Sequence, residues 1–520
     1  MPGYSIGIDP VRKRCCQAVE SFRPGEVVLS EDAYECVLSS DQCSNYCHHT
    51  FTSSTHLLRC TGCKFARYAS KEAQRAAWKN GHQQECAALR ACGRIPPATI
   101  RLAARIYWKQ LRLGGDGALP HSIESLEHHW DDLDDDRKQS YAQMAIVTRE
   151  YMKGSDTRIQ DAKDVAYLLA RFACNNHTIC DDELRAKGVG IYPLGAMLNH
   201  SCTPNTMQSF SGSRIVFRAV QHIPAGAEAT IAYVELAATR AERRAMLKAN
   251  YFFDIDADQE TCAADIPKEV RLDDTLMLEL FDRRSMTMDE HDPELTCVDS
   301  DTGSGANAVR VQAEERSTFF DEETEAGPSQ APAGQGNWEV KVQCWGAACL
   351  QGGEVRNGPT TQAVAVAWRL ATIVRLHASA SDLVSQGRAS EACDMIATAL
   401  QSMEDMQVLK QKHIWRMRLL EVQLRAAIEC GNRWDLALDA ARSLLPFYSW
   451  LYPKVWPNLG LHLAALAKIA ALLELFDEAA THAEAAAGIL RITHPEGQIV
   501  QEMLQLWHDA NAELNANAEE

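Results

Sequence analysis

The stretch that most constrains this chain is residues 195–233, built around the octapeptide Leu-Asn-His-Ser-Cys-Thr-Pro-Asn at 198–205. The mostly apolar residues 191–197 lead into this polar loop, and residues 214–220 then show the alternation of a β-strand. Residues 223–228 read Ile-Pro-Ala-Gly-Ala-Glu, which is a turn sequence, and a second apolar run ends at Tyr233. This order of loop, strand and turn predicts a β-rich core around the octapeptide.

Composition narrows the functional classes. A chain of 520 residues predicts two to four domains, and 46% apolar residues suffice for their cores. The net charge of −18 argues against broad nucleic-acid binding and fits a basic protein partner. The longest apolar run, around residues 459–476, carries His462 and Lys468, so it predicts a buried helix and no membrane span. Without a secretory signal or a basic import cluster, we expect a cytoplasmic or nuclear protein.

The cysteines predict metal binding. Nine of the 18 cysteines lie before residue 93, and the absence of a signal peptide favours thiols or metal ligands over disulfides. Ligand pairs occur as Cys43-x3-Cys47, Cys60-x2-Cys63 and His82-x3-Cys86. Paired thiolates and imidazoles at such spacing close a tetrahedral zinc site in a segment too small for its own core.

Helical patterns dominate residues 87–170 and everything after about 363. In the later region, the segments ending at Ala392, Ala437 and Ala479 resemble one another, and these alanines are 45 and 42 residues apart. A small residue recurring at a period of about 40 is typical of helical-hairpin repeats, with a plain helical bundle as the alternative. Residues 263–340 are acidic and rich in Gly, Pro and Ser, which predicts a largely disordered insert.

The Asn-His-Ser-Cys-x-Pro-Asn loop, the following turn and Tyr233 resemble the core of SET-domain methyltransferases. The 43–86 segment resembles a MYND zinc finger, and the C-terminal helices resemble a tetratricopeptide-like domain. This order is that of the SET-and-MYND family. The resemblance implies an α+β fold: a β-rich SET core interrupted by a MYND finger and a helical insert, then an all-α C-terminal domain. The implied domains are SET strands 1–40, finger 41–88, helical insert 89–170, SET core 171–236, post-SET 237–262 with a remainder at 341–358, and helical domain 360–516.

The resemblance also implies the metal sites. In the family's cross-braced order, Cys60, Cys63, His82 and Cys86 form one complete zinc site, and Cys43 and Cys47 hold half of another. The two further cysteines that the family has fall on Ala69 and Ala73 here. Either His48 or His49 completes the half site, or that zinc is absent. A third site would join Cys202 to the distant Cys262, Cys344 and Cys349; we expect one or two zincs per chain in total.

By resemblance, the activity is transfer of a methyl group from S-adenosylmethionine to a lysine amine. Tyr233 and Tyr251 would form the catalytic lysine channel. The cofactor positions are Arg12, Arg14, Tyr167, Asn175, Asn199, His200, Tyr233 and Phe253. Taken singly, these residues could equally be core aromatics, caps and turns. The chain departs from the family where Lys13 and Cys15 replace glycines in the turn that approaches the cofactor.

Two functions from different classes follow. The first is a protein-lysine N-methyltransferase that acts as a monomer on histone or non-histone proteins. The second is a catalytically weak scaffold that binds partner peptides through its finger and helical repeats. Neither the substrate nor the number of methyl groups added can be read from the residues.

Overall fold

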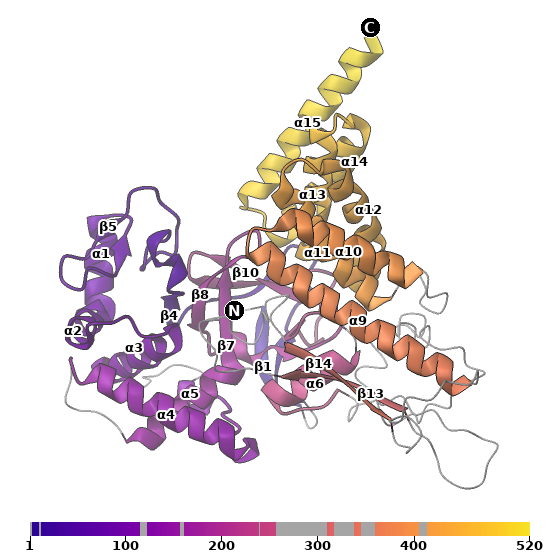
Figure 1. Cartoon of the computed structure of the whole chain (residues 1–520). Coiled ribbons are helices and arrows are strands. Elements are labelled where there is room, and N and C mark those ends of the chain that lie inside the picture. The colour runs from indigo at the N-terminus through magenta and orange to yellow at the C-terminus, as the bar shows by residue number, and fades with distance from the viewer. Residues whose placement is uncertain are drawn as a thin grey trace.

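The structure is a computed structural model that describes residues 3–9, 12–114, 122–155, 161–238, 240–255, 309–316, 337–344, 359–404 and 413–519. For 309–316, 337–344 and 359–371 it describes the backbone alone. Figure 1 shows a β-rich core with helices on one side and a stack of helices rising from it towards the C-terminus. No helix in these ranges is long and apolar enough to cross a bilayer.

The core is a set of small sheets whose strands come from both the N-terminal segment and the segment that follows residue 175. Strand β3 (Val27–Asp32) pairs with β11 (Arg214–Ala219), which also pairs with β10 (Thr206–Ser211). Strand β8 (Ala186–Ile191) lies between β4 (Glu35–Leu38) and β7 (Asn176–Cys180). Because β3 and β4 pair with strands more than 140 residues later, residues 41–175 form an insertion within the core. The apolar faces of β3, β11 and neighbouring segments meet around Leu29, Phe217 and Leu198.

A second pair of strands positions the octapeptide. Strand β9 (Asn199–His200) runs parallel to β12 (Thr230–Ile231). The hairpin of β1 (Tyr4–Asp9) and β2 (Lys13–Ala18) lies beside them, and Gln17 forms an isolated bridge with Glu228. Three segments distant in sequence, 12–18, 199–200 and 228–233, therefore meet at one edge of the core.

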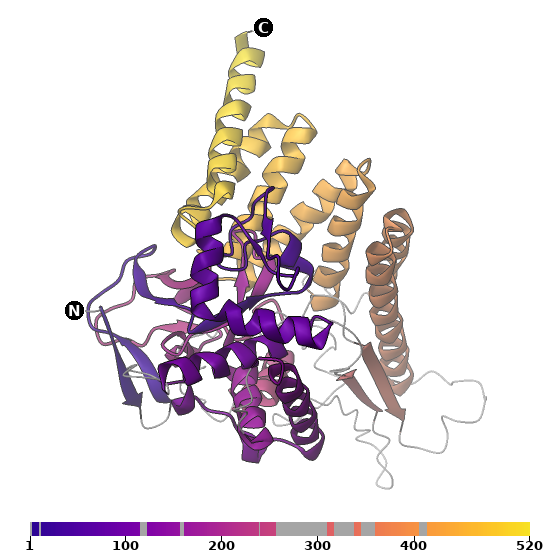
Figure 2. The ribbon, with the colours of Figure 1, turned by 90° about the vertical axis from the view of Figure 1, so that its left-hand side faces the viewer.

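The insertion begins with the finger and continues as helices. Ser70 accepts a hydrogen bond from the Ala73 amide, which sets the start of α1 (Lys71–Ala77). Gly81 has a φ of +116°, and the resulting kink separates α1 from α2 (Gln83–Cys92). Figure 2 shows the finger and these helices together, facing the viewer. The remaining elements before residue 256 are η1 (Asp41–Ser44), β5 (Leu58–Arg59), β6 (Arg67–Tyr68), η2 (Trp78–His82), α3 (Ala98–Leu113), η3 (Ile123–Ser125), η4 (Trp130–Asp132), α4 (Asp135–Met152), α5 (Ala162–Asn175), η5 (Gly195–Met197) and α6 (Arg240–Tyr251).

The C-terminal region is a succession of helices in which each packs against the next. Ala392, Ala437 and Ala479 are each fully buried, and each lies near the start of the second helix of a hairpin: α10, α12 and α14. A side chain as small as alanine lets two helices approach closely there. The helices are α9 (Pro359–Ser385), α10 (Ala389–Glu404), α11 (Ile414–Cys430), α12 (Trp434–Leu451), α13 (Pro457–Leu472), α14 (Phe476–Thr493) and α15 (Gln498–Glu519).

The predicted α+β class, with a β-rich core and an all-helical C-terminal region, is confirmed. The tetratricopeptide-like label and the domain boundaries stay predictions. Within the insert expected to be largely disordered, the structure describes a β-hairpin of β13 (Val309–Arg316) and β14 (Asn337–Cys344). Both strands alternate apolar and polar residues, a period-two signal that the overall composition of the insert concealed. The rest of 263–340 lies outside the described residues.

We expect replacement of Glu421 by glutamine to stabilise the protein at alkaline pH. The Glu421 carboxylate accepts a hydrogen bond of 2.6 Å from Tyr448, and burial, with Glu235 nearby, raises its pKa to about 7. The folded chain thus keeps a proton that the unfolded chain releases near pH 4.5. Stability from this group is complete below pH 4.5 and lost as pH rises through 7.

For Glu421→Gln we expect the free energy of unfolding to be larger than that of the wild type by about 3 kcal/mol at pH 8 and by less than about 1 kcal/mol at pH 5. Thermal unfolding at both pH values measures this difference. Glu513→Gln, on the exposed end of α15, is the control and should unfold as the wild type does. Equal effects of Glu421→Gln at pH 5 and pH 8 would contradict the expectation.

Candidate active site and metal centre

Asn199 and His200 lie at the centre of a polar network. The Asn199 amide nitrogen donates to Glu228 Oε1 at 2.8 Å and to the Arg14 carbonyl oxygen at 2.9 Å. Arg12 donates to the His200 carbonyl oxygen at 2.7 Å and forms an ion pair of 2.8 Å with Glu228. Glu228 therefore fastens the Arg12 turn to the Asn199 loop, although the two are nearly 190 residues apart.

The turn that lacks its glycines still forms. Lys13 has a φ of +61°, in the left-handed region that glycine adopts readily and other residues at a cost of roughly 1–2 kcal/mol. The side chain of Cys15 is buried, and in the hairpin this residue pairs with Gly7. Lys13 thus takes the backbone conformation of a glycine, while its Cβ remains at the turn.

Tyr233 and Tyr251 lie against each other, with ring centroids 4.6 Å apart. The Tyr233 hydroxyl donates to the Leu198 carbonyl oxygen at 2.7 Å, and the Tyr233 amide donates to His200 Nδ1 at 3.0 Å. Phe253 lies 6.3 Å from both the Tyr233 and the His200 rings and is 38% exposed. Burial, above all, raises the pKa of Tyr233 and of Tyr251, so both hydroxyls are neutral at physiological pH.

A narrow cavity of about 30 Å³ opens beside these tyrosines. Its wall contains apolar side chains from residues 195–198 and β12, and polar side chains from the start of β7 and from β10. The lining residues are Cys174, Asn176, His177, Gly195, Ala196, Leu198, Gln208, Ile231, Ala232, Tyr233 and Tyr251.

Residues 122–130 contact three of the predicted cofactor residues: Arg14, Asn175 and Tyr167. Arg14 donates to the Ser125 carbonyl oxygen at 2.6 Å and lies 3.6 Å from the Glu127 carboxylate. The Asn175 amide donates to the Glu127 carbonyl oxygen at 2.9 Å. This segment joins the Arg14 hairpin to the end of α5.

Tyr167 also contacts this segment. Its ring stacks on His128 with centroids 5.0 Å apart and meets the edge of Trp130 at 4.8 Å. Next to them, His129 stacks on Phe252 at 4.7 Å. The structure therefore gathers Arg12, Asn199, His200, Tyr233, Tyr251 and Phe253 into one set of contacts, and Arg14, Tyr167 and Asn175 into an adjoining one.

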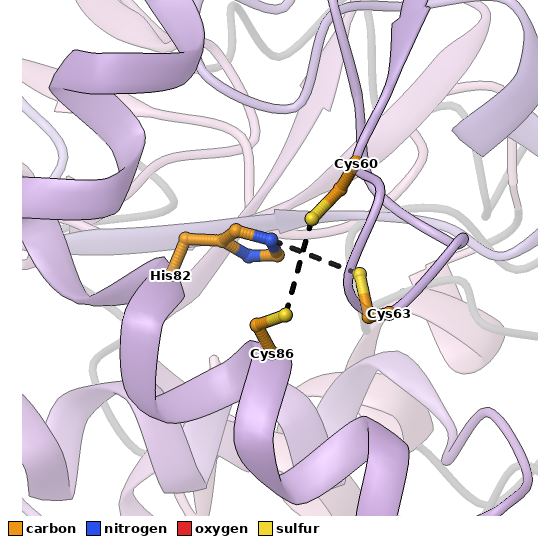
Figure 3. Close-up of side chains that lie close together, drawn as sticks. All are labelled: Cys60, Cys63, His82 and Cys86. Carbon is orange, nitrogen blue, oxygen red and sulfur yellow. Dashed lines mark hydrogen bonds between the residues drawn. The ribbon is translucent and has the colours of Figure 1, made fainter.

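The complete zinc set comes together in the finger. The ligand atoms of Cys60, Cys63, His82 and Cys86 all lie within 4.8 Å of one another (Figure 3). Cys63 Sγ is 3.7 Å from His82 Nε2, and Cys60 Sγ is 3.9 Å from Cys86 Sγ. Three thiolates and one imidazole converging on one point fit a tetrahedral zinc ion.

A chain of charged groups behind the cluster orients its histidine. His82 Nδ1 is 3.0 Å from the buried carboxylate of Glu85, which leaves Nε2 facing the thiols. Arg105 then contacts both Glu85, at 3.3 Å, and Glu35 of β4, at 3.1 Å. A carboxylate on the second nitrogen fixes the tautomer of a metal-binding histidine and raises its basicity. The same chain ties the finger to the core sheet.

The other predicted ligands do not form a comparable group. Cys60, Cys63, His82 and Cys86 are the one cluster of three or more candidate ligands in the described ranges. Cys43 Sγ donates to the Ser39 carbonyl oxygen at 3.1 Å, and Cys47 packs in an apolar cluster that includes Ala73. Cys202 Sγ lies 3.4 Å from His200 Nε2. Cys262, Cys349 and the side chain of Cys344 are outside the described residues, so the third site stays a prediction. Cys43 and Cys47 are described, but no group of three ligands forms around them among the described residues, and the half site also stays a prediction.

Sequence reasoning missed several residues of these sites. Glu228 is the last residue of the predicted turn, and its acidic side chain next to an apolar run was the available signal. Glu127, His128 and His129 precede an acidic stretch at residues 131–136 and show no recognisable pattern of their own. Asn176 lies beside Asn175, and the resemblance assigned only Asn175 to the cofactor site.

Comparison with known proteins agrees with this geometry. A SET domain model matches residues 13–234. Mouse histone-lysine N-methyltransferase SMYD3 is 33% identical over 273 residues, covering 49% of this chain and 63% of the relative. The Arabidopsis thaliana histone-lysine N-methyltransferase ASHR1 is 33% identical over 255 residues, covering 47% and 52%. Human N-lysine methyltransferase SMYD2 is 32% identical over 258 residues, covering 48% and 59%.

The chain therefore spans between about half and two-thirds of the length of these relatives. The matched region contains the octapeptide, Glu228 and Tyr233, whose contacts are described above. Residues 13–234 of this chain match the SET domain, and the chain is similar to histone-lysine and N-lysine methyltransferases of the SMYD type.

Proposed function

We propose that this chain is a protein-lysine N-methyltransferase that uses S-adenosylmethionine. The observation that carries the proposal is the Tyr233–Tyr251 pair, which borders a narrow cavity beside the Asn199–His200 loop of a SET domain. The names of the relatives, histone-lysine and N-lysine methyltransferases, support the same reaction class.

The residues present fit the cofactor. Asn199, His200 and Arg12 supply amide, backbone and guanidinium groups at one place, and Phe253 offers a partly exposed aromatic face next to them. Arg14, Tyr167 and Asn175 would close the site on the side of residues 122–130. When bound, S-adenosylmethionine supplies an electrophilic methyl group on a sulfonium sulfur, which keeps the bonding electron pair as the methyl passes to nitrogen.

For this reaction the protein must bind the substrate lysine with its amine in the neutral form. A lysine amine with a pKa of about 10.4 is protonated at pH 7, and removing that proton costs roughly 4–5 kcal/mol. The apolar side chains of Leu198, Ile231 and Ala232 in the cavity wall disfavour the charged form. Tyr233 and Tyr251 stay neutral, and no covalent intermediate with the protein is required, so the site acts by desolvation and orientation. The proton of the methylated amine leaves to water.

The partners follow from the same proposal. The substrate is a protein or peptide that carries lysine, and the net charge of −18 favours a basic one. One zinc ion would be held by Cys60, Cys63, His82 and Cys86. The finger and the C-terminal helices are candidate sites for partner peptides. We propose a monomer in the cytoplasm or nucleus.

One observation favours the scaffold as a second candidate. Lys13 brings a side chain to a turn where the family has glycine, and both carboxylate oxygens of Glu228 are engaged by Arg12 and Asn199. A cofactor that approaches this turn would have to accommodate the Cβ of Lys13.

Calorimetric titration with S-adenosylmethionine separates the two functions. We expect saturable binding to the wild type and about 10- to 100-fold weaker binding to Asn199→Ala, which loses the hydrogen bonds to Glu228 and Arg14. Asn511→Ala in α15, whose amide contacts only the Trp507 carbonyl among the described residues, is the matched control and should bind normally. A well-folded wild type that binds no S-adenosylmethionine would refute the methyltransferase and leave the scaffold.

A further inference from the structure

One residue in the cavity wall carries a buried polar atom that has no assigned role. Asn176 begins β7, and its side-chain oxygen, Oδ1, is shielded from solvent. Among the residues that the structure describes, this oxygen accepts no hydrogen bond. A buried carbonyl oxygen without a donor is costly, and such atoms in native proteins call for a ligand or another explanation.

The residue that carries this oxygen lines the cavity of the proposed amine channel. Asn176 lines this cavity together with Tyr233 and Tyr251. The nearby polar groups already have partners: the Tyr233 hydroxyl donates to the Leu198 carbonyl oxygen, and His177 Nδ1 is 2.7 Å from Gln208 Oε1.

His177 contributes no competing charge. Because the amide oxygen of Gln208 only accepts, Nδ1 of His177 carries the hydrogen. Burial lowers the pKa of His177 to about 4, and its ring lies between Tyr192 and Phe217. The ring is therefore neutral at pH 7, and this part of the wall is free of cations that would repel an amine.

We infer that Asn176 Oδ1 accepts a hydrogen bond from the substrate amine and thereby limits how many methyl groups are added. This inference rests on the proposed methyl transfer. A lysine nitrogen carries fewer N–H groups after each methylation, and a trimethylated nitrogen carries none. Each added methyl removes a donor that the oxygen requires, so amines with few or no methyl groups bind best.

Free L-lysine and its Nε-monomethyl, dimethyl and trimethyl derivatives test this without knowledge of the protein substrate. Their binding to the full chain saturated with S-adenosylhomocysteine is measured by ligand-observed NMR. In the wild type we expect affinity to fall with each methyl group. In Asn176→Leu, which has nearly the same shape without the acceptor, we expect the preference for lysine over trimethyl-lysine to fall about tenfold. Asn176→Asp keeps an acceptor and should keep the preference.

The outcomes separate the two proposals. If lysine binds the wild type and Asn176→Leu ranks the four amines as the wild type does, Asn176 has no such role, while the proposed reaction stands. If no amine binds the wild type, the amine channel itself is wrong and both proposals fail. Thermal unfolding checks each variant, and Asn176→Ala, a smaller change with the same expected loss of preference, replaces the leucine variant if that one does not fold.

Discussion

The Cys86→Ser variant is expected to lose the zinc of the finger and, with it, the folded structure of residues 41–92. Cys86 is one of four residues whose ligand atoms lie within 4.8 Å of one another, and its side chain is 3% exposed. A structural zinc site contributes about 10–16 kcal/mol to the folding of a finger peptide, which is more than the small apolar cluster around Tyr68 and Ala77 can replace.

Elemental analysis should give one or two zincs per chain for the wild type and one fewer for Cys86→Ser. Hydrogen exchange of the α1 and α2 amides should rise in parallel. Cys92→Ser is the matched control, since Cys92 lies on the same helix but outside the cluster. Cys92→Ser should keep its zinc and the slow hydrogen exchange of the α1 and α2 amides. Three zincs in the wild type would contradict the metal count, and an unchanged zinc content in Cys86→Ser would contradict the ligand set.

The second large effect is expected at Tyr233. Replacement by phenylalanine should lower methyl transfer by about 10²–10³-fold, the usual loss when one oriented hydroxyl is removed from a reaction site. The Tyr233 hydroxyl borders the cavity and is held by the Leu198 carbonyl oxygen at 2.7 Å. Binding of S-adenosylmethionine should change little, because the Asn199 contacts do not involve this hydroxyl.

Transfer of labelled methyl groups to a mixture of core histones measures this effect, with calorimetry for the cofactor. Tyr192→Phe removes a hydroxyl that also donates to a backbone carbonyl, that of Ser213 at 2.6 Å, from a buried ring that does not itself line the cavity. This control should lose some stability and keep its turnover. Equal turnover in Tyr233→Phe and the wild type would exclude the proposed role of Tyr233.

Several features could be predicted from residues alone because they depend on short-range geometry. Cys60-x2-Cys63 and His82-x3-Cys86 each set two ligands at fixed separation, and the four meet as predicted. The alanine period placed Ala392 and Ala437 at buried positions, because helical repeats bring equivalent residues to equivalent contacts. Tyr233 and Tyr251, predicted by resemblance as one channel, lie in contact.

Other features depend on which distant segments pack together, and no local pattern carries that information. Glu228 bridges Arg12 and Asn199 only because the β1–β2 hairpin lies beside β9 and β12. The conformation of Lys13 shows that a residue other than glycine can form this turn once the hairpin holds it.

Spacing along the chain determined the ligand pairs Cys60-x2-Cys63 and His82-x3-Cys86, and the resemblance carried by the octapeptide implied the class of fold and the place of the site. The tertiary structure alone decided that Asn176, at the start of β7, lines the same cavity as Tyr233 and that its Oδ1 has no donor among the described residues. The physical reason is that burial and hydrogen-bond pairing belong to the packed molecule: they arise only when segments far apart in sequence exclude water from the same space.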